Sequence, residues 1–397
     1  MFASADYRRV WAIGGLSGVA RWLEFVALAI FAYELTHSAE LVALLAVLRM
    51  LPYVLLGFVT GALADTIDRK GLLAASLLIM VLSSAAMAVL TATGNASYAA
   101  VAVATMISGA FWTIDMPVRR RLLVDAAGPG NISAALGFDN STMYATRALG
   151  PLIGGATYQF LGIEGIYALI ASSYFVCVLL TSRLGKGAAP SPVAGLTRIG
   201  LHLLIPPRAL ILNRHFQIML GVTLVYNLWC WPFVMMVPVI AQRDFGLAPT
   251  LVGALTACEG IGGALGALLV GVLSSERTLF RFYYLGTFSF LALMLGLALH
   301  LTAGTAVPVL LVLGVASAAF SATQYALVYT LSPPDMRGRA TGVLSLFIGS
   351  SMLGHYHAGL LFERLGSSQA ITVMAIEGAL VMAILGVLWW RAPAPDG

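Results

Sequence analysis

Ionisable side chains lie inside long apolar stretches of this 397-residue chain, and these are the residues that could do chemistry. Arg21 and Glu24 share one such stretch, and Glu259 lies in another. A charge near the middle of a bilayer costs about 3 kcal/mol on insertion scales, so each of these residues needs a partner or a function. Residues three apart share one face of a helix, and we therefore predict that Arg21 and Glu24 neutralise each other.

A carboxylate beside an arginine stays ionised, whereas the same carboxylate in an apolar cavity holds its proton more tightly. A pair whose partner moves away could therefore take up and release a proton. We interpret Glu24 and Glu259 as the candidate carriers. The alternative is an ion pair that stays closed and locks helices together.

His355 and His357 resemble a metal pair only on paper. Two residues apart on a helix, they point to nearly opposite sides and cannot both bind one ion, so we predict no metal site. At most one of them faces a cavity, where it could titrate. Arg49 is expected to face the pathway, whereas Asp115 and Asp139 are expected to be solvated at the ends of their helices.

The elements that must hold these residues are membrane helices. Of the chain, 60% is apolar and only 10% is charged, and the mean hydropathy is +0.92. A soluble protein of this length could not hide so much apolar surface. The first apolar stretch, from Val10 to about Phe31, is too long for a cleavable signal. The three cysteines lie in apolar stretches and predict no disulfide framework.

A helix that crosses the hydrocarbon needs about 20 apolar residues. Stretches of this kind predict an all-α integral membrane protein with twelve transmembrane helices. The predicted spans are 10–35, 41–63, 71–93, 97–117, 134–160, 164–183, 215–240, 249–273, 281–303, 306–331, 340–362 and 368–390.

Most of the 22 Lys and Arg residues fall in alternate loops on one side of these spans. Short basic loops stay in the cytoplasm, so both termini are predicted to be cytoplasmic and the chain to be multi-pass in the inner (plasma) membrane. Orientation also explains the net charge of +5 without a nucleic-acid partner.

A Pro-rich basic segment divides the chain. We predict an N-terminal six-helix bundle over 1–183, a cytoplasmic linker over 184–213 and a C-terminal six-helix bundle over 214–397. The halves are weak repeats offset by roughly 204 residues, and a site between repeated halves is common in transporters. Gly150 and Gly155, for example, correspond to Gly354 and Gly359.

The loop after the second span has Gly61, three residues, Asp65 and then the basic pair Arg69 and Lys70, and this pattern resembles the signature of the major facilitator superfamily. In this superfamily the loop is a cytoplasmic gate latch. Thr66 and Asp68 depart from the usual residue types, and an ordinary polar turn is the alternative. The residues of this gate motif are Gly61, Asp65, Asp68, Arg69 and Lys70.

The fifth span is similar to the antiporter motif of drug-exporting major facilitators. Its glycines allow close packing and its proline bends the helix, as in a hinge between halves. Thr146 replaces a glycine, and chance is the alternative, because Gly and Pro are common in membrane helices. The motif residues are Gly137, Thr146, Gly150, Pro151, Gly154 and Gly155.

Over its full length the chain resembles the enterobactin-exporter-like branch of the superfamily, through Ala64-Asp65, 117–122, 147–151 and 334–339. The resemblance implies the two-bundle fold, with the fifth and eighth helices adjacent, and hence a pair of Arg147 with Glu259. It places Glu377 on a peripheral helix, where a tertiary contact is expected. The arginine that the family carries in its fourth helix is expected to be absent, because span 97–117 has no internal cation.

The first, fourth, seventh and tenth helices line the pathway in this family, and aromatic side chains there suit a partly apolar organic solute. Pro232 and Pro238 are expected to disturb the seventh span. The candidate cavity residues are Trp22, Phe25, Arg49, Trp112, Tyr226, Asn227, Trp229, Trp231, Gln324, Tyr325 and Tyr329.

These patterns predict a monomeric secondary transporter that exports a small organic solute, such as a drug, siderophore or metabolite, in exchange for protons by alternating access. An uptake symporter or a uniporter is the nearest alternative. A membrane enzyme or a transport-inactive sensor is the alternative of another class. We predict no enzyme and no cofactor, because no nucleophile with its base and no phosphate-binding glycine loop occurs.

Overall fold

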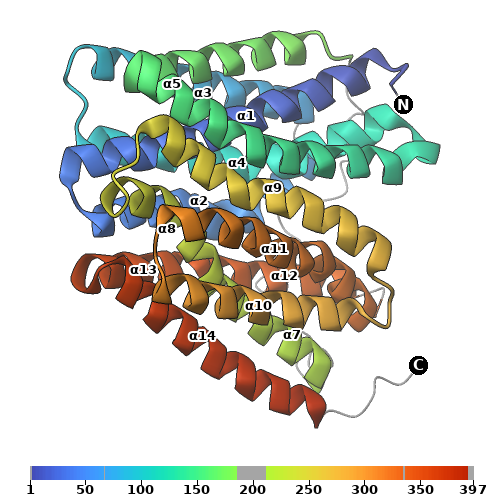
Figure 1. Cartoon of the computed structure of the whole chain (residues 1–397). Coiled ribbons are helices and arrows are strands. Elements are labelled where there is room, and N and C mark those ends of the chain that lie inside the picture. Colours follow the sequence, from blue (N-terminus) through green and yellow to red (C-terminus); the bar gives the residue numbers. More distant parts are fainter. Residues whose placement is uncertain (1, 67, 186–211, 334–335, 392–397) are drawn as a thin grey trace. The chain divides into compact units, whose positions relative to one another are not determined.

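The computed structural model describes residues 2–66, 68–185, 212–333 and 336–391, and every regular element within these ranges is helical (Figure 1). For residues 56–66, 129 and 133 the description is limited to the backbone. Most of the predicted linker, 186–211, lies outside the described residues.

The chain divides into two compact units. Unit 1 comprises 1–37, 48–199 and 247–257, and unit 2 comprises 38–47, 200–246 and 258–397. The units differ from the predicted halves at two segments: 38–47 belongs to unit 2, and 247–257 belongs to unit 1. As a result, α2 (Ala39–Thr66) and α9 (Pro249–Leu273) are each divided between the two units.

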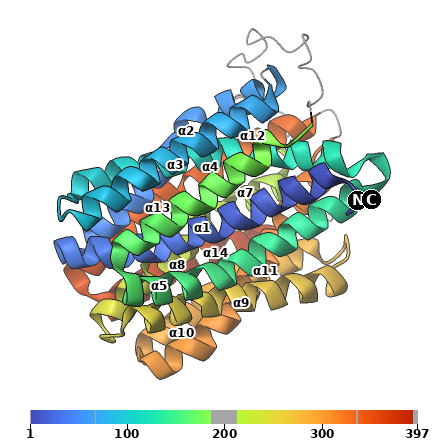
Figure 2. The ribbon, with the colours of Figure 1, turned by 90° about the horizontal axis from the view of Figure 1, so that it is seen from above.

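Unit 1 is built on four long helices, each of which packs against at least two of the others (Figures 1 and 2). Side-chain oxygens accept hydrogen bonds from the first free amides of three of them, with Ser4, Asp68 and Ser97 as the N-caps. The four helices are α1 (Ala5–Thr36), α3 (Arg69–Ala92), α4 (Tyr98–Ala127) and α5 (Ile132–Ser182).

Helix α5 consists of two arms that meet at Gly162, whose φ of 67° and ψ of −175° interrupt the helix. Thr142 in the first arm contacts Trp11, and Arg183 just after the second arm contacts Arg9, so both outer ends lie beside the start of α1. The arms are therefore antiparallel, as predicted for the spans 134–160 and 164–183. A glycine makes this turn possible because a positive φ strains other residues.

After 38–47, the described part of unit 2 resumes at Leu212, and the side chain of Asn213 caps α7 (Arg214–Val225). A π-helical turn, η4 (Tyr226–Cys230), joins α7 to α8 (Trp231–Arg243). The remaining helices are α10 (Leu279–Leu299), α11 (Ala303–Leu331), α12 (Arg337–Gly349), α13 (Ser351–Leu365) and α14 (Ser367–Trp390). Within the unit, α10 packs against both α11 and α14.

The π-helical turn lies directly before Pro232, where the sequence predicts a disturbance. Proline lacks an amide hydrogen and cannot make the normal bond to the preceding turn. The carbonyl oxygens of Asn227 and Leu228 face Gly354 of α13, where an added Cβ would lie 2.6 Å from each. Only a glycine allows α13 to approach the widened turn this closely.

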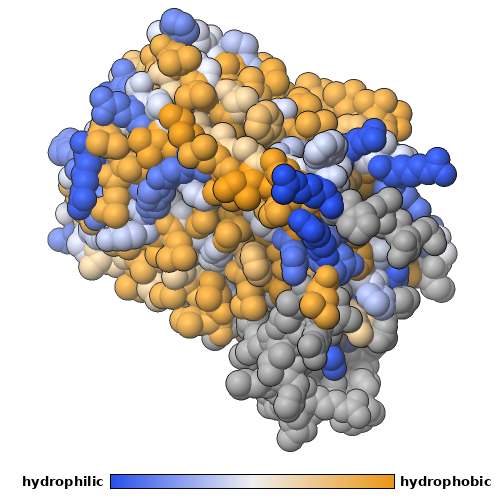
Figure 3. Space-filling view, turned by 90° about the horizontal axis from the view of Figure 1, so that it is seen from below, coloured by the Kyte–Doolittle hydropathy of each residue, from blue (hydrophilic) through white to orange (hydrophobic). Residues whose placement is uncertain are grey.

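Apolar residues cover much of the face shown in Figure 3, with hydrophilic residues between and beside them. Large side chains such as Leu268 and Val272 of α9 are 69% and 84% exposed. Among the described residues, nine helices are long and apolar enough to span a membrane, and 134–182, which holds both arms of α5, counts as one of them. The helices are consistent with the twelve predicted spans. Helix α4, however, ends ten residues later than predicted, at Ala127.

Glycine contacts between α9 and α11 provide a test of this packing. A Cβ at Gly262 would overlap the carbonyl oxygen of Leu311, whereas a Cβ at Gly271, in the same helix, would meet no atom within 4 Å. We expect Gly262→Ala to lower the free energy of unfolding by about 1–3 kcal/mol through overpacking. Gly271→Ala is the matched control and should be neutral or slightly stabilising. Thermal unfolding of the purified protein in detergent measures both, and equal midpoints for the two variants would contradict the described packing.

Candidate functional site

Glu24 lies inside unit 1 with only 3% of its surface exposed. Its Oε2 accepts a hydrogen bond from Arg49 Nη2 of α2 at 3.0 Å and another from Ser108 Oγ of α4 at 2.8 Å. Both are charge-assisted bonds of good length, and they join α1, α2 and α4 at one carboxylate. Glu24 is thus held by donors from two other helices.

The predicted pairing of Arg21 with Glu24 is wrong. Arg21 Nη2 lies 3.6 Å from Asp115 Oδ2 of α4 instead, and its guanidinium lies 5.4 Å from the centre of the Trp112 ring. Arg21 and Glu24 do share a face of α1. However, Asp115 of α4 is better placed to pair with Arg21, and Arg49 of α2 is better placed to pair with Glu24. A spacing of three residues cannot reveal such tertiary partners.

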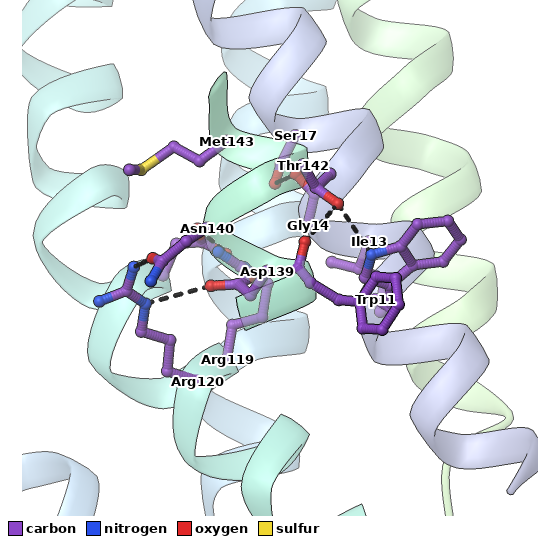
Figure 4. Close-up of polar contacts among 12 residues, drawn as sticks. Trp11, Ile13, Gly14, Ser17, Arg119, Arg120, Asp139, Asn140, Thr142 and Met143 are labelled. Atoms are coloured by element: carbon purple, nitrogen blue, oxygen red, sulfur yellow. Dashed lines mark hydrogen bonds and ion pairs between the residues drawn. The ribbon is translucent and has the colours of Figure 1, made fainter. Parts of the chain in front are cut away.

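Asp115 and Asp139, which we expected to be solvated, are 0% and 4% exposed. Asp115 Oδ2 lies 3.4 Å from Arg119 Nε, and Arg119 Nη1 lies 2.5 Å from Asp139 Oδ1. Arg120 reaches the other oxygen of Asp139 at 3.1 Å (Figure 4). The expectation of interfacial solvation is therefore wrong for both acids.

The expectation that the fourth span has no internal cation is also wrong. Helix α4 continues to Ala127, so Arg119 lies within it, and this arginine is only 5% exposed. The basic run 119–121 resembled a cytoplasmic loop, and the span was therefore ended too early. Asp115 and Arg119 are four residues apart, a spacing that favours an ion pair on a helix, and this signal could have identified them.

Together these residues form a buried group that we name the charge chain. It joins α1, α2, α4 and α5 through two groups of ion pairs, one centred on Glu24 and one running from Arg21 to Asp139. With all carboxylates ionised it holds one more positive than negative charge, and a proton on Glu24 would add a second. The members are Arg21, Glu24, Arg49, Asp115, Arg119, Arg120 and Asp139.

The second predicted pair, Arg147 with Glu259, joins residues of different units. Arg147 is partly exposed and its guanidinium lies 5.4 Å from the centre of the Trp22 ring, while Glu259 is 2% exposed. Their pairing stays a prediction.

The two histidines contact different partners, as their spacing predicts. His355 is buried and its Nδ1 contacts the carbonyl oxygen of Ser351. His357 Nε2 lies 2.8 Å from Glu377 of α14, and Trp229 Nε1 donates to the same carboxylate at 2.8 Å. The tertiary contact expected of Glu377 is therefore present.

Each candidate cavity aromatic of unit 1 packs against another aromatic ring. The Trp22 and Phe25 rings meet edge to face at 5.8 Å, and Trp112 stacks on Tyr53 at 6.3 Å. Trp22, Phe25 and Trp112 are all partly exposed. Their role in lining a pathway stays a prediction.

The candidate cavity residues of unit 2 fall into a buried group and an exposed group. Tyr226 stacks on Phe320 at 3.8 Å and its hydroxyl lies 2.7 Å from that of Ser317. Asn227 donates to a carbonyl oxygen of its own helix, and Gln324 is 5% exposed. Partly or largely exposed are Trp229, Trp231, Tyr325 and Tyr329.

Of the gate motif, Gly61 and Asp65 are described by their backbone alone, within α2, and side chains are described from Asp68 onward. Asp68 caps α3 by accepting from the amides of Lys70 and Gly71. Arg69 lies 3.1 Å from Asp125 of α4, and Lys70 donates to the carbonyl oxygen of Ser182 at 3.1 Å. The basic residues thus tie α3 to α4 and to the end of α5.

The antiporter-like motif provides contact surfaces on two sides of α5. Toward α1, Gly154 lies against the backbone of Leu23, where an added Cβ would be 3.1 Å from its Cα, and Gly150 faces the Cβ of Trp22. Thr146 lies against Gly18 in the same interface. Toward α9, Gly155 meets the Pro249 carbonyl and Gly253, and Pro151 offers its own carbonyl to Gly253. Gly137 makes no comparably close contact.

The charge chain predicts a large difference between two aspartates. Asp139 is buried between two arginines, whereas Asp125 is 37% exposed on its side chain and pairs with Arg69 and Arg121. Asp139→Asn removes the carboxylate shared by Arg119 and Arg120, leaves the buried Arg119 with Asp115 as its remaining ion-pair partner, and should cost about 3–5 kcal/mol of stability. Asp125→Asn, the matched control, should cost about 1 kcal/mol or less.

Thermal unfolding of both variants in the same detergent measures this difference. A midpoint for Asp139→Asn within the error of that for Asp125→Asn would contradict the buried arrangement.

The sequence profile of the Major Facilitator Superfamily matches the chain over residues 10–354 and 218–397. The staphyloferrin A transporter of Staphylococcus aureus (strain NCTC 8325 / PS 47) is 24% identical over 284 residues, 71% of each chain. The uncharacterized MFS-type transporter YfiS of Bacillus subtilis (strain 168) is 27% identical over 385 residues, which cover 90% of this chain and 87% of that one.

Solved structures share the fold at lower identity. A bacterial homolog of the human lysosomal transporter Spinster, in an inward-facing and unoccupied conformation, superposes with a TM-score of 0.76. The two are 14% identical, and the match covers 98% of each chain.

Proposed function

The chain belongs to the Major Facilitator Superfamily, and from this premise we propose that it exports a small, partly apolar organic solute in exchange for protons by alternating access. Membership makes it a multi-pass membrane transporter of a small solute rather than an enzyme. The observation that carries the proposal is the burial of Glu24 between Arg49 and Ser108.

Glu24 supports exchange because a proton and a hydrogen-bond donor of the solute would compete for the same oxygen. The carboxylate already accepts two donors from α2 and α4. A protonated Glu24 would no longer hold Arg49 by charge, so the contact between α1 and α2 would weaken. A solute that donates an amine or hydroxyl hydrogen to Glu24 would restore the ionised state and displace the proton.

The antiporter-like motif supports the direction of transport. Its glycines and proline give α5 close backbone contacts with both α1 and the first turns of α9. Backbone contacts without side chains between them allow helices to rock while they stay packed. Glu24 lies one residue from Leu23, which Gly154 contacts, so the proposed hinge and the proposed proton carrier share one interface.

The solute is proposed to belong to the same broad class as siderophores. The support is the match to the staphyloferrin A transporter. A partly apolar molecule with polar substituents can bind to both aromatic rings and cations. Unit 1 offers the rings of Trp22, Phe25 and Trp112 and the guanidinium of Arg147, which lies over the Trp22 ring.

Proton-coupled uptake is the second candidate, and one observation favours it. Protonation of Glu24 would free Arg49 and leave the charge chain with two excess positive charges. An anionic solute would then bind together with the proton, which is the requirement for symport. The charge of the solute therefore decides between exchange and symport.

The first functional prediction concerns the driving force. With ethidium and staphyloferrin A as probes, dissipating ΔpH in expressing cells should raise the retained amount of any exported solute, because exchange then loses its proton supply. Retention that falls on the same treatment would support symport, and unchanged retention would support a uniporter. Cells with the empty vector provide the baseline.

The second functional prediction concerns Glu24, the proposed proton carrier. Glu24→Gln keeps the shape but removes the charge, so ΔpH-driven transport in proteoliposomes should fall by about tenfold or more, in line with the loss of charge-assisted hydrogen bonds. Glu276→Gln, an exposed carboxylate between α9 and α10, is the control and should transport normally. Full ΔpH-driven transport by Glu24→Gln at normal expression would exclude Glu24 as the carrier.

A further inference from the structure

Unit 2 holds a second ionisable group within an apolar helix face, and it shares no residue with the charge chain. Glu377 lies ten residues into α14, about 15 Å along the helix and therefore near the middle of a bilayer about 30 Å thick. Its side chain is 39% exposed and that of its partner His357 is 40% exposed. A charge at this depth without full burial needs an explanation.

The surroundings of Glu377 show which side of the helices it occupies. Leu380 and Ile384, three and seven residues later on the same stripe of α14, are 62% and 61% exposed. Leu353, one turn before His357 on α13, is 66% exposed. Gly359 packs against Ala43 on the opposite side of α13. An exposed aliphatic stripe of this kind faces acyl chains, so the carboxylate opens toward the lipid.

One oxygen of Glu377 is fully used and the other is not. Oε2 receives both Trp229 Nε1 and His357 Nε2 at 2.8 Å. Among the described residues, Oε1 has no hydrogen-bond partner. No water competes for this oxygen within the hydrocarbon, so a donor that reaches it from the bilayer would be bound strongly.

From this geometry we infer that Glu377, with His357 and Trp229, forms a membrane-facing site that binds the amino group of a lipophilic amine. The ammonium donates to Oε1, and its charge balances the carboxylate. Trp229 and His357 hold Oε2, which leaves Oε1 to face the incoming ammonium. The apolar body of the ligand lies against the stripe of Leu353, Leu380 and Ile384.

A solute fits the site better than a bilayer lipid does. The amino group of phosphatidylethanolamine stays with the headgroups, about 15 Å from the middle of the hydrocarbon. A lipophilic amine dissolved among the acyl chains can place its nitrogen at the depth of Glu377. The site stands whether or not the proposed proton exchange through Glu24 is correct.

The test uses the whole protein in nanodiscs of phosphatidylcholine and the hydrophobic reagent dicyclohexylcarbodiimide, which adds to carboxyl groups that it reaches from the bilayer. Mass spectrometry of the peptides measures the labelled fraction of each carboxylate. Glu377 should be labelled, whereas Glu259, which is 2% exposed, should not be. Absence of label on Glu377 would overturn its opening to the lipid.

N,N-Dimethyldodecylamine, a tertiary amine that cannot form an amide with the activated carboxyl, should lower the labelling of Glu377 at concentrations about tenfold or more below those needed with dodecanol, because only the amine carries a charge and an ammonium donor. Equal protection by the two would overturn the amine site. Nanodiscs that contain phosphatidylethanolamine should show no protection, and protection there would overturn the assignment to a solute. Glu377→Gln should remove the label from this peptide.

Discussion

The arrangement of unit 1 depends on the cost of ionised groups in a hydrophobic environment. Seven charged side chains from four helices lie in or near the interior, and an ionised group there costs free energy unless an opposite charge is within reach. Asp115 links Arg21 with Arg119, and Asp139 links Arg119 with Arg120. The helices that carry these residues are therefore held in one relative position by charge as well as by packing. Any movement that separates one pair must provide a proton, a solute group or a new partner.

Unit 2 relies on a different kind of contact. Tyr226, Phe320 and Tyr283 form a continuous stack with ring separations of 3.8 and 4.8 Å, and hydroxyl groups at its margins pair with Ser317 and Thr223. The weak sequence repeat between the halves does not extend to this chemistry. Buried ion pairs hold the interior of unit 1 together, whereas stacked rings with neutral hydrogen bonds hold this part of the interior of unit 2.

Much of the fold follows from the sequence because membrane helices need long apolar stretches and because glycine motifs mark close contacts. The turn between the arms of α5, the disturbance before Pro232 and the contacts of Gly150, Gly154 and Gly155 were all indicated by residue types and spacing. The partners of Glu24 were not indicated in this way, since Arg49 and Ser108 are distant from Glu24 in the sequence. The end of α4 was misplaced because a run of three arginines resembles a loop, although buried acids opposite it allow the helix to continue.

The π-helical turn at 226–230 contains one residue more than an α-helical turn would need. Each residue of an α-helix advances the side-chain direction by about 100°, so α7 and α8 present faces that are offset by this angle from those of a straight helix. Removing one residue from the turn would straighten the helix and rotate one of its two halves. Buried side chains such as Phe216 or Phe233 would then point outward. The length of this short segment thus determines which residues of a thirty-residue helix belong to the interior, even though none of them changes identity.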